Sequence, residues 1–215
     1  MKRCVSLLLC LSLLACSEAG FRGYWKAHSI DYTDIQAAED QFALYAEQAV
    51  AAPEAEALTS LDVLFDRLQK DEVAYFLYTG WIDGAFYPVL SPCRNAALYT
   101  KAVERMAADG IISEEEVARR QQKSRWIQFN RKGAPATVPG FEPDGRRTLV
   151  LVLDPACPSC REAVEAVSAD PRWEDVPRVT VFCGDAPDVF DPQLTPVYFV
   201  VSADGTVETP YTAVL

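Results

Sequence analysis

The sequence predicts an α+β protein in which an all-helical N-terminal domain precedes a smaller α/β domain. Three observations carry this prediction. Apolar residues recur at helical spacing from Thr33 to about Lys132. Glycine and proline then interrupt the pattern around Gly133. Beyond that point two β-prone runs enclose a helical one, and a hairpin signal follows.

The composition excludes some classes of function. The 215 residues are 50% hydrophobic, which provides a core and argues against wholesale disorder. The formal net charge is −11, from 20 basic and 31 acidic residues. Such acidity argues against a nucleic-acid partner and against a surface for anionic membranes.

The first residues, "MKRCVSLLLCLSLLAC", are typical of a secretory signal peptide: a basic start, a short apolar stretch and a small residue before a cysteine. Their end resembles a bacterial lipobox. We therefore expect a lipoprotein signal peptide over residues 1–15, removal of Cys4 and Cys10 with it, and lipidation of Cys16. Two acyl chains would anchor the protein stably to a membrane of the cell envelope. Ordinary signal cleavage is the alternative.

The helical domain is expected over residues 16–132. Thr33 and Gln36 form a possible capping box for the first long helix, and Pro53 can open the second. In the second helix the leucines and phenylalanine of residues 58–68 share one face.

Three more helices are predicted in this half. "DEVAYFLYTG" predicts a short helix closed by Gly80, and "WIDGAFYPVLSPCRN" predicts a loop. Asn95 can cap a helix that runs through Met106, with Gly110 just past its end. A capping box opens at Ser113, and the basic residues that follow, including Arg120 and Lys123, are interpreted as a solvated helix face.

The second domain is expected over residues 133–215. Residues 148–153 are a continuous apolar run, suited to a strand buried on both faces. A helix over 159–170 and a second buried strand over 178–183 follow. Residues 196–202 and 206–210 flank a turn at Asp204-Gly205, which predicts a β-hairpin.

This second domain resembles the thioredoxin fold. The residues that carry the resemblance are "CPSC" after the first strand, "TPVYFVVSADGTV" at the hairpin and "GAPA" before the first strand. With the helical half and "SPCRNAALY", the whole chain is similar to the Bacteroides-type thioredoxin-like lipoproteins, whose N-terminal region is a domain of unknown function. They are related to peroxide-reductase and cytochrome-maturation thioredoxin-like proteins. The resemblance implies that Pro196 is cis beside the cysteine pair, with the Thr195 backbone free to pair with an extended substrate.

The residues themselves predict the same chemistry. Only a thiolate attacks a disulfide, and a helix N-terminus favours the thiolate of Cys157. Cys160, one turn further on, can attack the resulting mixed disulfide. Pro158 donates no backbone N–H and stiffens the first turn. We expect Cys157 and Cys160 to be catalytic and Pro158 to contact substrate. The resemblance adds Pro196 as a catalytic residue and Thr195 as a substrate contact.

Other interpretations of the pair remain. A zinc site needs four ligands. Besides this pair the sequence offers one distant histidine and scattered cysteines, which do not make a second pair of ligands, so no metal is expected. A structural disulfide between Cys157 and Cys160 would close so short a loop that it would add little to the free energy of unfolding. The pair could also be idle in a scaffold that only binds, which makes a non-enzymatic envelope-binding lipoprotein the alternative function. Thiol–disulfide exchange needs no cofactor. The expected partners are envelope proteins with thiols or disulfides, and a redox partner protein.

The chain departs from thioredoxin in several places. Leu151 stands where thioredoxin has a buried acid, and Ala156 replaces the usual aromatic residue before the first cysteine. The segment 184–195 is too short for the usual connecting helix, and no terminal helix follows the hairpin. Either the N-terminal helices cover that sheet face or it serves an interface. Cys93 and Cys183 are expected to be unpaired, with a disulfide between them as the alternative.

Overall fold

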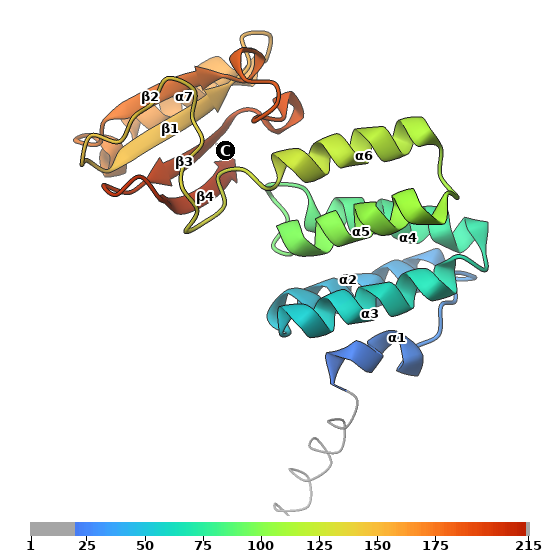
Figure 1. Ribbon diagram of the computed structural model, residues 1–215. Coiled ribbons are helices and arrows are strands. Elements are labelled where there is room, and N and C mark those ends of the chain that lie inside the picture. The colour runs from blue at the N-terminus through green and yellow to red at the C-terminus, as the bar shows by residue number, and fades with distance from the viewer. Residues whose placement is uncertain (1–19, 214–215) are drawn as a thin grey trace, which may run out of the picture.

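The computed structural model describes residues 20–213, and it consists of a helical domain and an α/β domain joined end to end (Figure 1). The predicted signal peptide and Cys16 lie outside the described residues. The two domains meet where α6 leads into the segment that precedes the sheet.

The helical domain stacks its helices in antiparallel layers (Figure 1). A 3-10 turn, Phe21–Gly23, precedes them. The helices are α1 (Tyr24–Ala27), α2 (Ile35–Ala51), α3 (Glu54–Leu68), α4 (Glu72–Phe86), α5 (Ala96–Asp109) and α6 (Glu114–Trp126). None of the helices described is long and apolar enough to cross a bilayer.

The first two long helices bury the faces that their spacing predicts. On α3 Leu61, Leu64, Phe65 and Leu68 are fully buried. The cap of α2 differs from the expectation, because Asp34 rather than Thr33 accepts the hydrogen bond from the N–H of Ala37, at 3.1 Å. Thr33 is instead bonded to the carboxylate of Asp31.

Helix α4 contradicts the prediction that Gly80 closes a short helix. It continues through Gly80 and Gly84 to Phe86, over residues expected to form a loop. Tyr78, Ile82 and Phe86 on its inner side are fully buried. A helical glycine costs about 1 kcal/mol, which such burial outweighs. Pro88, not glycine, marks the break.

Helix α5 agrees with its predicted start and stop. The side chain of Asn95 accepts the N–H of Leu98 at 3.0 Å, and Gly110 takes the left-handed conformation at φ 65° just past the end. The helix runs three residues beyond Met106, to Asp109.

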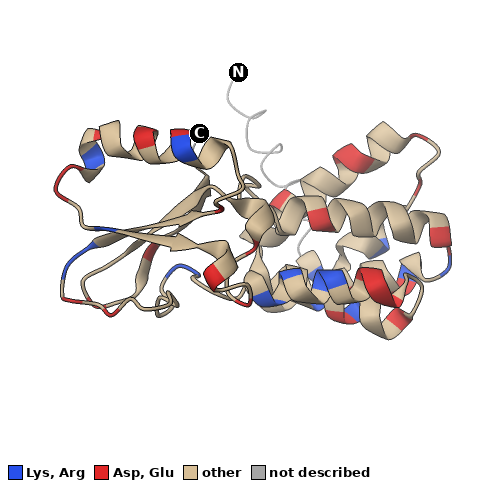
Figure 2. Ribbon diagram, turned by 90° about the horizontal axis from the view of Figure 1, so that it is seen from above, with Lys and Arg blue, Asp and Glu red and all other residues tan. Residues whose placement is uncertain are grey.

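Helix α6 carries the basic residues interpreted as a solvated face, and this interpretation is only partly right (Figure 2). Arg120 is only 9% exposed and donates to the carbonyl of Thr79 at 2.9 Å. The Nζ of Lys123 lies 2.9 Å from the carboxylate of Asp83 on α4. These two cations therefore bind α6 to α4.

The α/β domain is built on a mixed sheet with the order β2-β1-β3-β4. Its elements are β1 (Thr148–Leu153), α7 (Ser159–Ala169), β2 (Arg178–Phe182), β3 (Val197–Val201) and β4 (Val207–Ala213). β2 runs parallel to β1, while β3 is antiparallel to both β1 and β4. Every residue of β1 is buried, as predicted for a central strand. β2 is an edge strand with only Val181 buried, so the prediction of a second buried strand was wrong.

The two sheet faces are covered differently. Helix α7 covers one face, where Leu149, Leu151 and Val200 pack with Cys160 and Val167. The other face is covered by irregular segments: residues around 136–141, the stretch 183–194, and the side chain of Val89 from the helical domain. Three-residue 3-10 turns at Cys183–Asp185 and Pro192–Leu194 take the place of the usual connecting helix.

Polar contacts join the two domains. The hydroxyl of Tyr87 donates to the buried carboxylate of Asp191, and the indole N–H of Trp126 donates to the carbonyl of Pro187 at 2.7 Å. The amide of Asn130 reaches the hydroxyl of Tyr211 on β4 at 2.9 Å. The helical domain thus touches the loop that leads into β3.

Candidate active site

The chain places Cys157 and Cys160 where the central strand turns into α7. β1 ends at Leu153, and the N–H of Cys157 donates to the carbonyl of Asp154 at 3.0 Å. Pro158 occupies the helix N-cap with φ −60°, and Cys160 is the second residue of the helix. Cys160, Ala163 and Val167 form the buried stripe of α7, so packing of this stripe on the sheet fixes the second sulfur.

The two cysteines differ in exposure. Cys157 is half-buried, whereas Cys160 is only 6% exposed. An open depression of about 260 Å³ lies over them, lined among others by Pro158, Arg161 and Phe182. The first sulfur is thus open to a partner molecule, and the second lies behind it.

The surroundings shift the two thiols in opposite directions. The Cys160 thiol, and then the Ser159 hydroxyl at 3.1 Å from its sulfur, lower the pKa of Cys157 below its ordinary value. Burial raises the pKa of Cys160, and the neighbouring Cys157 adds to that rise. A lowered pKa favours the thiolate, so Cys157 is the better nucleophile of the pair.

Thr195 and Pro196 lie where β3 begins, next to the end of β1 from which the cysteines follow. The peptide bond between them is cis, as the resemblance implies. Val197, the next residue, pairs with Val152 on β1, close to the end from which the cysteines follow. The Thr195 side chain lowers the pKa of Cys160, although burial raises that pKa by more. The fold therefore places Thr195 and Pro196 at the same end of the sheet as Cys157, Pro158 and Cys160.

The floor beneath Cys160 is apolar. Leu151, which is 3% exposed, packs in the same cluster as Cys160 together with Leu153 and Trp173. The backbone N–H of Asp154 donates to the Cys160 sulfur at 3.4 Å. This N–H can stabilise a Cys160 thiolate, and the Thr195 side chain also lowers the pKa of Cys160, with no carboxyl group at position 151.

Three residues of the site were not singled out from the sequence. They are Ser159, whose hydroxyl contacts Cys157, Asp154, whose N–H contacts Cys160, and Phe182, which is 41% exposed beside the cysteines. Ser159 lies inside the CxxC motif, so the sequence alone could have predicted a hydroxyl group close to Cys157. The place of Phe182 depends on the parallel pairing of β2 with β1, opposite Leu153.

The remaining described cysteines are unpaired. Cys93 and Cys183 are both buried and free, as predicted, and Cys183 packs as a small apolar side chain beneath the sheet. Burial raises the pKa of both thiols. Over residues 20–213, no group of three or more His, Cys, Asp or Glu side chains is arranged to hold a metal ion.

Comparison with known proteins supports the fold. No protein-family model and no curated protein matches the chain. A solved structure does: a thioredoxin-like protein from Bacteroides caccae, with a TM-score of 0.66 and 18% sequence identity, over 89% of this chain and 87% of that one. The architecture is therefore a helical domain followed by a thioredoxin-like α/β domain, as the sequence predicted.

Proposed function

We propose that this protein is a cell-envelope thiol–disulfide oxidoreductase that acts on protein disulfides through Cys157 and Cys160. The observation that carries the proposal is the asymmetry of the pair at the start of α7. The outer sulfur is accessible with a lowered pKa, and the inner sulfur is buried with a raised pKa. Neither a structural disulfide nor a pair of inert thiols requires two sulfurs that differ in exposure and pKa, whereas a nucleophile and a resolving thiol do.

In the reductive direction the Cys157 thiolate attacks one sulfur of a substrate disulfide. A mixed disulfide forms, and the other substrate sulfur leaves as a thiolate that takes up a proton. Cys160 then loses its proton and attacks the Cys157 sulfur, which releases the second substrate thiol. Two electrons pass to the substrate, and the 157–160 disulfide remains. The same steps in reverse oxidise a dithiol, and a redox partner protein resets the pair.

The substrate would bind across the depression beside the cysteines. Thr195 precedes the cis proline, and no backbone N–H within residues 20–213 donates to its carbonyl. That carbonyl can accept a hydrogen bond from an extended substrate strand. Pro158 and Phe182 line the depression and offer apolar contact. We therefore expect extended, partly apolar segments of envelope proteins as substrates.

The envelope location rests on the sequence of the first residues. A basic start, a short apolar run and Leu-Leu-Ala-Cys support export and acylation at Cys16. Outside the cytoplasm, protein disulfides persist, so substrates for exchange are available there.

The mechanism is tested with two variants that differ only in which sulfur is lost. Cys160→Ser keeps the attacking thiol but cannot resolve, and it should accumulate mixed disulfides with envelope proteins on non-reducing gels. Cys157→Ser, the matched control, should accumulate far fewer. Equal and negligible trapping by both would reject exchange and leave the non-enzymatic binding lipoprotein as the better account.

A further inference from the structure

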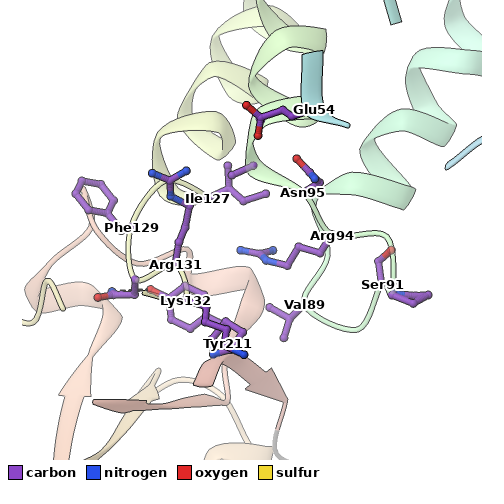
Figure 3. A pocket seen from close by; sticks show the side chains of 15 residues that line it. Glu54, Val89, Ser91, Arg94, Asn95, Ile127, Phe129, Arg131, Lys132 and Tyr211 are labelled. Atoms are coloured by element: carbon purple, nitrogen blue, oxygen red, sulfur yellow. Dashed lines mark hydrogen bonds between the residues drawn. The ribbon is translucent and has the colours of Figure 1, made fainter. Parts of the chain in front are cut away.

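A larger cavity lies away from the cysteines, between the two domains. It has a volume of about 450 Å³ and is lined by the N-terminus of α5, the segment after α6 and the end of β4. This volume falls within the range of small-molecule sites. Arg94 extends into it from the loop before α5, as Figure 3 shows, and Arg131 and Lys132 line it from the segment after α6.

The charge of this cavity is opposite to that of the protein. Arg94, Arg131 and Lys132 line it, against the single carboxylate of Glu54. Across residues 20–213, none of these three cations is in an ion pair. In a chain of net charge −11, three unpaired cations around one cavity form a concentrated positive site.

Arg94 is held in place by a carbonyl and two aromatic rings, and within residues 20–213 it forms no ion pair. Its guanidinium donates to the carbonyl of Tyr87 and lies 5.5 Å and 5.9 Å from the ring centres of Tyr87 and Tyr211. The nearby carboxylate of Asp191 offsets part of the charge but makes no ion pair with Arg94, and it accepts from the Tyr87 hydroxyl and from the N–H of Gln193. Burial lowers the pKa of Arg94, though an arginine this basic stays charged. A half-buried, fixed guanidinium is thus left with donors to offer.

The rest of the wall suits an anion that carries an apolar group. Ala96 and Ala97 of the α5 first turn line the cavity, and no described group accepts hydrogen bonds from their N–H groups. These donors and the helix dipole favour negative charge. Val89, Ile127 and Phe129 supply apolar surface on other sides.

We propose that the cavity between the domains binds a small organic oxyanion, a carboxylate or a phosphate ester, through Arg94, Arg131 and Lys132. The oxyanion contacts the three cations and the first turn of α5, and the organic part packs on Val89 and Phe129. The site is separate from the cysteine pair, so it does not depend on the proposed exchange activity.

The test is isothermal titration of the full chain at low ionic strength with phenyl phosphate, benzoate, inorganic phosphate and the uncharged benzyl alcohol. We expect saturable one-to-one binding of an aromatic anion, weaker binding of inorganic phosphate and none of benzyl alcohol. Phenyl phosphate and benzoate distinguish the two oxyanion classes. The Cys157→Ser/Cys160→Ser variant should bind as the unaltered protein does.

Matched variants assign the site. Arg131→Gln/Lys132→Gln removes two exposed charges that are free of ion pairs in the described structure, and it should weaken binding about tenfold or more. Arg94→Lys keeps the charge but loses the planar fork, and should also weaken binding. Arg125→Gln, an exposed arginine of α6 outside the cavity, is the control and should change nothing. No saturable binding of either aromatic anion, or equal binding by the double variant, would overturn the proposal.

Discussion

Two cysteines separated by two residues meet opposite surroundings in this protein. Cys157 lines an open depression next to the Ser159 hydroxyl, whereas Cys160 packs in an apolar cluster that includes Leu151. The sequence predicted that the pair lies at the start of a helix with the first cysteine outermost, because position at a helix start is a local property. It did not predict the groups that contact each sulfur, since these depend on side-chain rotamers and on neighbouring strands.

Ser159→Ala tests the local control of Cys157. The Ser159 hydroxyl lies 3.1 Å from the Cys157 sulfur and stabilises its thiolate, after the larger effect of Cys160. Its loss should raise the pKa of Cys157, so alkylation by iodoacetamide would reach half of its maximal rate at a higher pH. Ser168→Ala, on the same helix but away from the sulfurs, should leave the pH profile unchanged. An identical profile for Ser159→Ala would show that the hydroxyl plays no such role.

At the scale of elements, helix α4 shows what local patterns miss. From the sequence, Gly80 was predicted to end a helix and Gly84 to lie in a loop. In the structure the buried side of α4 continues past both glycines to Phe86. Tertiary burial outweighs the helix propensity of two glycines. Arg120 and Lys123 were misjudged for the same reason, because their partners Thr79 and Asp83 lie on α4, far away in sequence.

Gly80→Ala should stabilise the protein by about 0.5–1 kcal/mol, because alanine loses less backbone entropy in a helix. A Cβ at Gly80 would meet nothing within 4 Å, and the position is exposed. Gly110→Ala is the contrasting change: Gly110 has φ +65°, which alanine adopts at a cost, so that variant should be less stable. Urea unfolding measures both. Destabilisation by Gly80→Ala would contradict the continuous helix.

The strands of the second domain were more predictable than the covering of its sheet. A fully buried central strand, a helix opened by the cysteine motif and a hairpin are all short-range signals, and each is present. Which segments cover the second face was not predictable. Irregular segments such as 183–194 lack the regular spacing of apolar residues that marks a helix or strand in the sequence.

At the scale of the whole molecule, the two domains are coupled through the loop before the cis proline. Asp191 accepts from Tyr87 of the helical domain and caps the turn Pro192–Leu194, which leads directly to Thr195. The helical domain thus supports the segment that leads to the cis proline.

Tyr87→Phe should therefore lower the free energy of unfolding by about 1–3 kcal/mol, because it leaves the buried Asp191 carboxylate without one of its donors. It should also slow reaction at Cys160 by loosening the turn. Tyr32→Phe is the matched control, since its hydroxyl also donates to an aspartate, Asp71, but within the helical domain at a more exposed place. Equal effects of the two changes on thiol reactivity would contradict the coupling.

The proposed membrane attachment depends on Cys16, which lies outside the described residues. Cys16→Ala should abolish acylation, leaving an unlipidated precursor or a soluble product in cell fractionation. Mass spectrometry of the unaltered protein should find a diacylated N-terminal cysteine at position 16. An unmodified mature N-terminus at another residue would reject the lipoprotein proposal.

The most direct test of the central claim is the reduction potential of the Cys157–Cys160 pair. The protein is equilibrated in glutathione buffers of graded ratio, the free thiols are alkylated, and the two redox states are counted by mass spectrometry. We predict a reversible two-electron transition between about −120 and −270 mV, the range of proteins that exchange disulfides. A pair that forms no disulfide at any ratio, or one still oxidised below about −300 mV, would contradict a redox function.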